Sequence, residues 1–593
     1  MAPTKRNISV FFFILALLIS ALALELAIVA VADPYIAPEE SPLGYRIYGN
    51  GTYDAPNLHR DGNVYTFTSD IEGTIVIERD GVVLDGSGYT LQGKGDSIGV
   101  WLQDRTGVAI KNLNIQNFEH GIRFTHYLPN WHSGQTNPSR TTNCTIQACN
   151  ITNNYYGISL YSCFNCTLLE NYIANSTYGV YLYGADNTFR NNRIEQNKYN
   201  FWDIDEYVNY VDTSNTINGK PIYYLVDQQN MTVPKNAGLV ILKRCSGIKV
   251  QNLNLTGQGS GLSLYYTNNS IIAGNKISDN YWRGIAIWWS NNNTIIGNQI
   301  ANTTGDGIEE YESSNNAFSH NLITTNAIGI YHRTPSFHDV ISDNQIVANQ
   351  NGGIYGASTN CTVTNNYIFG NSGVGISVGN NSVINGNNIT QNSGDGIWFG
   401  SNNSITNNSI SKNNNGLVTP RGSYNTISSN EIVLNVGGAL CLGSGGTEWE
   451  DAPRYNLIYS NNFIDNNQGG AQVIIRNITI LGIPFREEPG FANSWSKGAE
   501  GNYWSDYNGS GPYYINENNQ DYHPLLEPLE FHSLGMPSIE PPRETEADNT
   551  QTPTGSTDIP IWQIAAAIFV ISVAIASLSL LFFFKKRNTK SEI

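Results

Sequence analysis

The sequence predicts an all-β fold, a right-handed parallel β-helix solenoid with coils of about 22 residues, on three observations. The pattern Asn-x-Ile recurs from residue 275 to residue 430 in steps of 21 to 23 residues, and a period of this length marks a solenoid. Each repeat contains three short runs of strand-forming residues separated by Asn, Gly and Ser. No stretch of the repeats has the apolar periodicity of a helix.

The repeat also predicts how the coils stack. Successive coils of such a fold lie one strand spacing apart, about 4.8 Å. Inward Ile, Val and Leu side chains would form apolar ladders, and the turn asparagines would stack in hydrogen-bonded ladders. The usual handedness of parallel connections favours a right-handed coil.

The two ends of the chain predict a membrane-anchored surface protein. Residues 1–32 resemble a signal peptide, with Lys5 and Arg6 before a long apolar run; an uncleaved anchor is the alternative. Near the other end, residues 559–584 form an uncharged apolar segment long enough to span a bilayer. The basic residues that follow place the tail, residues 585–593, in the cytoplasm. The body is therefore expected outside the cell.

The remaining residues divide by composition. We expect an N-terminal cap over 33–80, the β-helix over 81–500, a C-terminal cap over 501–536 and a Pro/Thr/Glu-rich stalk over 537–558. Insertions interrupt the repeats near 126–142, 205–236 and 441–455.

The charge and the glycosylation sequons of the sequence limit the classes of partner that we expect. Only 14% of the residues are charged and the net charge is -17, which argues against nucleic acid as a partner. Asn-x-Ser/Thr sequons predict a glycoprotein if the cell glycosylates, for example at Asn143, Asn165, Asn254, Asn302 and Asn477.

Four of the seven cysteines are candidate disulfide partners. Cys144 and Cys166 both occur in Asn-Cys-Thr, 22 residues or one coil apart, and Cys149 and Cys163 form a second possible pair. The same turn position holds Thr or Ser in other coils, so a structural role as a small side chain is the alternative.

Aromatic side chains recur at outward positions of one strand per coil. Because side chains alternate along a strand, they are expected to form an exposed column that stacks on sugar rings. Preference of aromatic residues for strands is the alternative. The column comprises Tyr161, Tyr181, Tyr183, Tyr265, Trp288, Tyr311, Tyr331, Tyr355 and Trp398.

One coil breaks the apolar pattern. Glu310 occupies an inward position that other coils reserve for a hydrophobe, and His332 follows it one coil later. With Glu309 and Arg333, these residues are candidate catalytic groups for a polysaccharide hydrolase or lyase, since glycoside hydrolysis uses paired carboxylates. A satisfied structural Glu–His pair is the alternative, because a buried charge must be paired.

The sequence resembles the NosD-like β-helix proteins of archaeal cell surfaces, with repeats like those of carbohydrate-binding and sugar-hydrolysis domains. The resembling stretches are VVLDGSGYTLQG (82–93), NGKPIYYLVDQQNMTVP (218–234), VQNLNLT (250–256) and GNYWSDYNGSGPYY (501–514). The resemblance implies an extracellular β-helix. The family name comes from a periplasmic factor linked to copper-centre assembly, but three Met and nine scattered His argue against a soft copper site.

Together these patterns predict a protein that binds glycans or cell-envelope polysaccharide, without a metal or other cofactor. Three alternatives stay open: a polysaccharide hydrolase or lyase, a structural surface or adhesion protein, and a copper-related accessory protein.

Overall fold

The computed structural model describes residues 43–125, 140–333, 336–356, 358–443, 453–475, 479–480, 483–484, 492–531 and 535. All of them belong to the first of two compact units, residues 1–541. The predicted signal peptide, stalk, transmembrane segment and tail lie outside the described residues, as do parts of the insertions near 126–142 and 441–455. No helix within the described ranges is long and apolar enough to cross a membrane.

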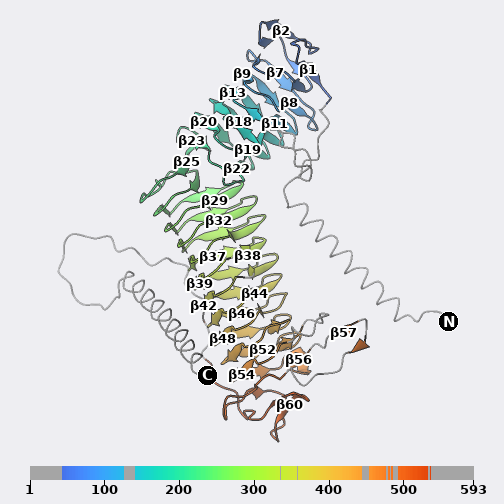
Figure 1. Cartoon of the computed structure of the whole chain (residues 1–593), viewed down its shortest axis with the longest axis vertical. Helices are drawn as coiled ribbons and strands as arrows, with labels where there is room; N and C mark the ends of the chain where they lie inside the picture. The colour runs from blue at the N-terminus through green and yellow to red at the C-terminus, as the bar shows by residue number, and fades with distance from the viewer. Residues whose placement is uncertain are drawn as a thin grey trace, which may run out of the picture. The chain divides into compact units, whose positions relative to one another are not determined.

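The described residues form a right-handed parallel β-helix of about 16 turns, which confirms the predicted fold class (Figure 1). Short strands separated by turns repeat around each coil, and each strand pairs in parallel with its equivalent in the next coil. The one helical element among the described residues is a 3-10 turn, η2 (Asn467–Gly469).

Three sheets run along each half of the solenoid. In the first half they extend from β1 (Tyr45–Ile47) to β22 (Tyr199–Asp203), from β2 (Leu58–Asp61) to β23 (Tyr210–Val211) and from β4 (Ile71–Glu72) to β24 (Thr216–Ile217). In the second half two sheets extend from β27 (Lys249–Gln251) to β54 (Leu457–Tyr459) and from β28 (Asn254–Thr256) to β59 (Tyr503–Trp504).

We call the third sheet of the second half the site sheet. Its strands, in spatial order, are β25 (Lys220–Val226), β26 (Leu239–Lys243), β29 (Ser260–Tyr265), β32 (Arg283–Trp288), β35 (Asp306–Tyr311), β38 (Ile328–Arg333), β41 (Gly352–Gly356), β44 (Val374–Val378), β47 (Ile397–Phe399), β50 (Leu417–Thr419), β53 (Leu440–Leu442) and β56 (Val473–Ile475).

Asparagine ladders hold the coils in register, as the repeat predicted. In the main ladder, each side-chain Nδ2 donates to the Oδ1 of the next asparagine at 2.9–3.0 Å, as between Asn366 and Asn387 and between Asn387 and Asn408. The same Oδ1 also accepts the backbone N–H of the preceding ladder residue. These contacts satisfy buried turn groups that water cannot reach. The residue before most ladder positions has a positive φ, for example Asn407 at 57°, which explains the abundance of Asn and Gly in the turns.

Close stacking also fixes a glycine at the start of most site-sheet strands. At Gly307, an added Cβ would lie 2.6 Å from Ile323 Cγ2 and 2.7 Å from the carbonyl oxygen of Gly329. Both atoms belong to the packed backbone and core of the stack, so no larger residue fits there. The recurrent Gly-Ile of the repeat is therefore a packing requirement.

The two halves of the solenoid meet at β26, which packs against two apolar cores. Leu239 and Ile241 belong to the core of the first half, and Val240 and Leu242 to that of the second. The chain reaches β26 through the antiparallel hairpin of β24 and β25, which comes from the region 205–236 that the sequence marked as an insertion. Strand β26 therefore contributes side chains both to the core of the first half and to the core of the second half.

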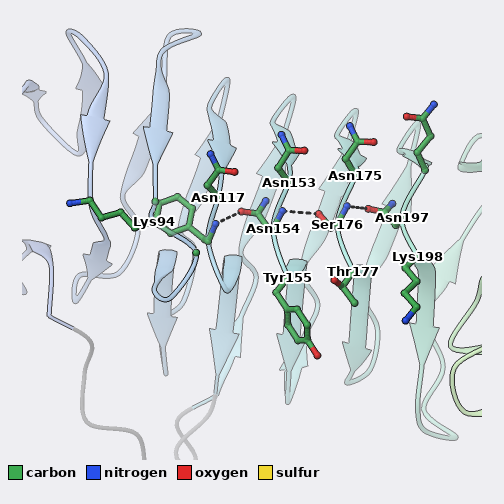
Figure 2. Close-up of a pocket in the computed structure, with 14 residues that line it drawn as sticks. Lys94, Asn117, Asn153, Asn154, Tyr155, Asn175, Ser176, Thr177, Asn197 and Lys198 are labelled. Carbon is green, nitrogen blue, oxygen red and sulfur yellow. Dashed lines mark hydrogen bonds between the residues drawn. The ribbon is translucent and has the colours of Figure 1, made fainter. Parts of the chain in front are cut away.

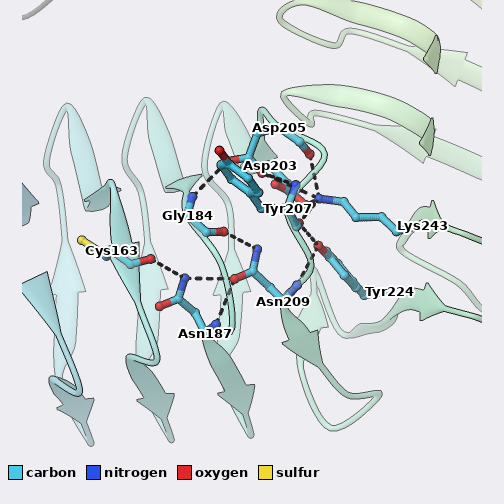
Figure 3. Close-up of polar contacts among 9 residues, drawn as sticks. All are labelled: Cys163, Gly184, Asn187, Asp203, Asp205, Tyr207, Asn209, Tyr224 and Lys243. Carbon is cyan, nitrogen blue, oxygen red and sulfur yellow. Dashed lines mark hydrogen bonds and ion pairs between the residues drawn. The ribbon is translucent and has the colours of Figure 1, made fainter. Parts of the chain in front are cut away.

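A fully buried ammonium group secures this junction (Figure 3). Nζ of Lys243 lies 2.8 Å from a carboxylate oxygen of Asp203 and donates to the backbone oxygens of Asp205 and Tyr207 at 2.7 and 2.6 Å. Burial raises the pKa of both aspartates, that of Asp205 to about 8. A buried pair of this kind is costly to break, because removing one partner leaves an uncompensated charge.

Asn387→Ala should destabilise the solenoid by about 3 kcal/mol, because it removes a ladder amide that donates to the carbonyl of Val363 and leaves the buried N–H of Asn366 without its partner. Thermal unfolding by calorimetry measures this. The matched control is Asn414→Ala, an exposed asparagine outside the ladders, which should cost less than about 0.5 kcal/mol. Equal effects of the two substitutions would show that the ladder does not hold the stack.

Lys243→Met should destabilise the protein by about 3–5 kcal/mol near neutral pH. Protonation relieves the stranded carboxylates, so the loss should be larger at pH 8 than at pH 5, as denaturant unfolding at the two pH values would measure. Arg244→Met is the control: its ion pair with Asp227 is exposed and screened by water, so its loss should have little effect on stability. A loss that does not change with pH would mean that the aspartates do not carry the effect.

Candidate functional site

The outer face of the predicted aromatic column is only partly exposed. Tyr355 and Trp398 are each 39% exposed, and Tyr161, Tyr183, Trp288, Tyr311 and Tyr331 are half-buried. The expectation of exposure is wrong for Tyr181 and Tyr265, which are buried.

Neighbouring side chains cover these two rings. Tyr181 packs edge-on against Trp202 at 5.1 Å, and Tyr265 lies between Trp288 at 5.7 Å and the ammonium of Lys243 at 4.9 Å. Because long aromatic side chains from adjacent coils cover one another, an outward register does not ensure exposure.

The exposed end of the column lines a groove of about 700 Å³ over β38 to β50. Tyr331 and Tyr355 contribute rings from adjacent coils, 6.1 Å apart, and Trp398 contributes a ring two coils beyond Tyr355. The charged side chains that line this groove, among the described residues, are Arg333 and Arg421. We call this feature the aromatic groove.

A buried ion pair lies beside the aromatic groove. Nε of Arg283 lies 2.5 Å from Oε2 of Glu309, and both side chains are at most 3% exposed. The guanidinium of Arg283 also covers the ring of Trp282 at 3.5 Å. Glu309 has a weaker contact with the exposed Arg333, at 3.8 Å. Glu309 is therefore paired with two arginines, the buried Arg283 and the exposed Arg333.

Asp306 belongs to the same outer face and is half-buried. Burial, and then the negative charge of Glu309, raise the pKa of Asp306 to about 7. A carboxyl group with such a pKa can donate a proton near neutral pH.

The four catalytic candidates divide between opposite faces of the strands. Glu309 and Arg333 lie on the outer face, whereas Glu310 and His332 point into the core, paired in register and at most 2% exposed. Nδ1 of His332 lies 2.7 Å from Oε2 of Glu310. Burial raises the pKa of Glu310 to about 7 and lowers that of His332. The strand itself separates the four side chains, so they do not form one active site.

Sequence reasoning missed Asp339, a third member of the inner group. Its Oδ2 lies 3.6 Å from His332 Nδ1, and burial together with Glu310 raises its pKa to about 9. Asp339 follows Asn316 by one period of 23 residues in an asparagine ladder, so its departure from the repeat was visible in the sequence. Sequence reasoning also missed Arg283, and no departure from the repeat pattern indicates its role.

A second groove, of about 1060 Å³, runs along the turns of the first half (Figure 2). Lys94 and Lys198 lie at its ends and Tyr155 projects from its wall. Its buried amides already serve the backbone: Asn154 Oδ1 accepts from the N–H of Phe118, and Asn197 Oδ1 from that of Ser176. This groove thus offers fewer rings and fewer uncommitted polar groups than the aromatic groove.

The cysteine candidates are buried free thiols. Cys144, Cys149, Cys163 and Cys166 are all unpaired in the structure. Cys144 and Cys166 are neighbours in a turn ladder, and a hydrogen bond with Cys144, together with burial, raises the pKa of Cys166. Burial raises the pKa of Cys149 to about 12. Buried free thiols of this kind act as small core side chains.

The stacked coils and the asparagine ladders define a protein of the parallel β-helix repeat class. Residues 98–237 and 224–368 match the family described as right-handed beta helix region, and residues 334–509 match the family described as periplasmic copper-binding protein (NosD). The chain is a NosD-like parallel β-helix repeat protein, as the sequence resemblance indicated. No curated protein matches the chain.

Solved structures with related folds include three that the chain resembles at low identity. The Dettilon tailspike protein (gp208) is 14% identical over 68% of this chain and 62% of its own, with a TM-score of 0.17. The periplasmic alginate epimerase AlgG is 13% identical over 71% and 80%, with a TM-score of 0.16. The α-1,3-glucanase catalytic unit from Streptomyces thermodiastaticus is 12% identical over 70% and 62%, with a TM-score of 0.23. The chain spans less than two thirds of the tailspike and glucanase chains. Structural matches with TM-scores this low carry no argument about the activity of this chain.

The described residues do not fit the copper named in the family description. Within 334–509 the chain has no Met, the described His338 is exposed, and Cys361 and Cys441 are buried. The ligand group that converges among the described residues, Glu310, His332 and Asp339, contains two carboxylates and no sulfur. Soft copper sites use Met, Cys and His, so we derive no role for copper here.

Asp306→Asn should flatten the dependence of stability on pH. The folded chain holds the Asp306 proton up to about pH 7, whereas an unfolded Asp releases it near pH 3.9. Stability therefore falls as pH rises from about 4 to 7. With allowance for partial exposure, Asn should recover about 2 kcal/mol at pH 8 and nothing at pH 3. Denaturant unfolding across this range measures the effect; identical slopes for the two proteins would refute it.

Proposed function

We propose that the protein binds an acidic polysaccharide of the cell envelope in the aromatic groove. The observation that carries this proposal is the combination of exposed rings and arginines along one groove. Tyr355 and Trp398 present accessible ring faces two coils apart, and the apolar face of a sugar ring stacks on such surfaces.

The charges in the groove favour an acidic ligand. Arg333 and Arg421 line it, and no carboxylate lines it among the described residues, although the whole chain has a net charge of -17. A guanidinium binds a carboxylate or sulfate through two parallel hydrogen bonds. Rings for the sugar faces and guanidinium groups for the acid substituents thus occur side by side.

The repeat suits a linear polymer. Each coil advances the surface by one strand spacing, about 4.8 Å, so equivalent side chains recur along the sheet at short, regular intervals. The family match to periplasmic proteins agrees with a body outside the cytoplasm. We propose in addition that residues 559–584 anchor this body to the membrane with residues 585–593 inside, so that the groove faces envelope glycans.

A polysaccharide hydrolase or lyase is the second candidate. It is favoured by one observation, the half-buried Asp306 with a pKa of about 7 beside the paired carboxylate of Glu309. Hydrolysis needs a protonated acid and an ionised partner. The tight pairing of Glu309 with Arg283 weighs against its use as a nucleophile, so binding remains the preferred function.

Trp398→Ala and Tyr355→Ala should each weaken binding to an acidic polysaccharide about tenfold, equivalent to about 1.4 kcal/mol, because each removes a stacking surface. Affinity electrophoresis of the protein in gels containing uronate-rich, sulfated or neutral polymers would measure it. Tyr514→Ala is the matched control, an exposed ring outside the groove, and should bind like the natural protein.

Arg421→Gln separates charge recognition from stacking. It should weaken binding to acidic polymers while leaving any binding to neutral ones unchanged, and added salt should reduce the difference. Size-exclusion chromatography of the same mixtures tests the second candidate: shortening of a polymer that is lost in Asp306→Asn would establish an enzyme. Absence of binding to every polymer would favour a structural or adhesion protein.

A further inference from the structure

Three consecutive departures from the repeat converge at one point inside the solenoid. The inward ladder of the site sheet reads Leu264, Ile287, Glu310, His332 and Gly356 through successive coils. A carboxylate and an imidazole thus replace two hydrophobes in adjacent coils.

The third departure comes from the neighbouring turn. In the adjoining asparagine ladder, the N–H of Asn293 donates to Asn316 Oδ1, and the N–H of Asn316 donates to Asp339 Oδ1 at 2.8 Å. Asp339 preserves this contact but replaces the amide NH₂ of an asparagine with a second oxygen, Oδ2. That oxygen cannot donate to the carbonyls that ladder amides normally reach, so the substitution sacrifices a structural contact.

The three side chains leave their facing atoms without hydrogen bonds. Neither ring nitrogen of His332, nor Oε2 of Glu310, nor Oδ2 of Asp339 has a hydrogen-bond partner among the described residues. The 2.7 Å contact between His332 Nδ1 and Glu310 Oε2 lacks the alignment of a hydrogen bond. All three side chains are at most 2% exposed. Buried polar atoms without partners are rare and costly.

We propose that Glu310, His332 and Asp339 form a structural site for a divalent transition-metal ion, best matched by Zn²⁺. One ligand atom from each residue lies within 4.8 Å of the other two. One imidazole nitrogen and two carboxylate oxygens are a zinc ligand set, whereas Ca²⁺ takes six to eight oxygens. Two carboxylates with a neutral imidazole also balance the charge of the ion.

The ion would join two consecutive coils. Glu310 lies on β35, His332 on β38, and Asp339 in the turn that precedes β39 (Val340–Ser342). The buried side chain of Ser336 also interacts with the Glu310 carboxylate, and Nδ2 of Asn316 donates to Glu310 Oε1. This second interaction fixes the orientation of the Glu310 carboxylate, as outer contacts do for metal ligands. Because the site is closed, the metal would enter as the coils fold.

Zinc content of the full-length chain tests the proposal. The protein, produced with Zn²⁺ and washed with a mild chelator, should retain about one zinc per chain by mass spectrometry. Asp339→Asn should lose it, since this near-isosteric change restores the ladder amide. A triple variant, Glu310→Ile with His332→Val and Asp339→Asn, restores residue types that other coils carry and should bind none. His338→Asn, which changes an exposed histidine beside the site, should retain the metal.

Stability provides the second measurement. Refolding with EDTA should lower the melting temperature of the natural protein and leave that of the triple variant unchanged, and Zn²⁺ should reverse the loss only in the natural protein. Co²⁺ in place of zinc should give visible absorption that Asp339→Asn abolishes. Absence of zinc from the natural protein after refolding with Zn²⁺, or equal zinc in the natural and triple variant proteins, would overturn the proposal.

Discussion

The register between coils is the constraint on which the rest of this structure depends. Parallel backbone pairing places each residue directly over its equivalent one coil away, and the asparagine ladders lock that placement through amides at 2.9–3.0 Å. A ladder amide serves two coils at once, since its oxygen accepts from one coil and its nitrogen donates to the next. Every other feature of the molecule follows from side chains stacked at this short and constant interval.

Because the coils stack in register, a substitution in one coil changes the surroundings of the equivalent residue in the next coil. An inward Glu in one coil must lie against the inward residue of the next, which is why Glu310 and His332 are neighbours. The same rule brings Asp339 beside Asn316 through a different ladder. A buried polar group in such a core needs a partner from the surrounding coils, a buried water or a bound ion, and this is the physical basis of the proposed zinc site. At the junction, the buried ammonium of Lys243 is satisfied by Asp203 and by two backbone carbonyls.

On the outer face the short interval between coils causes neighbouring side chains to cover one another. Aromatic side chains are wider than the spacing of the coils, so adjacent rings tilt and cover one another, as Tyr265 and Trp288 do. In the aromatic groove, accessible ring faces remain because the small Ser377 separates the coil of Tyr355 from that of Trp398. The groove thus depends on a small residue among large ones along the stack. Its two arginines make it basic, although the chain as a whole is acidic.

The sequence by itself determined the fold, the coil length, the inward and outward faces and the pairing of Glu310 with His332, because all of these follow from a period that the letters repeat. It also contained the signal for Asp339, an aspartate at an asparagine position, which pattern reading overlooked. Only the tertiary structure decided that Tyr181 and Tyr265 are covered, that Arg283 neutralises Glu309, and that Lys243 fastens the junction. These depend on side-chain conformations and on contacts between residues at different repeat positions, which a linear period does not specify.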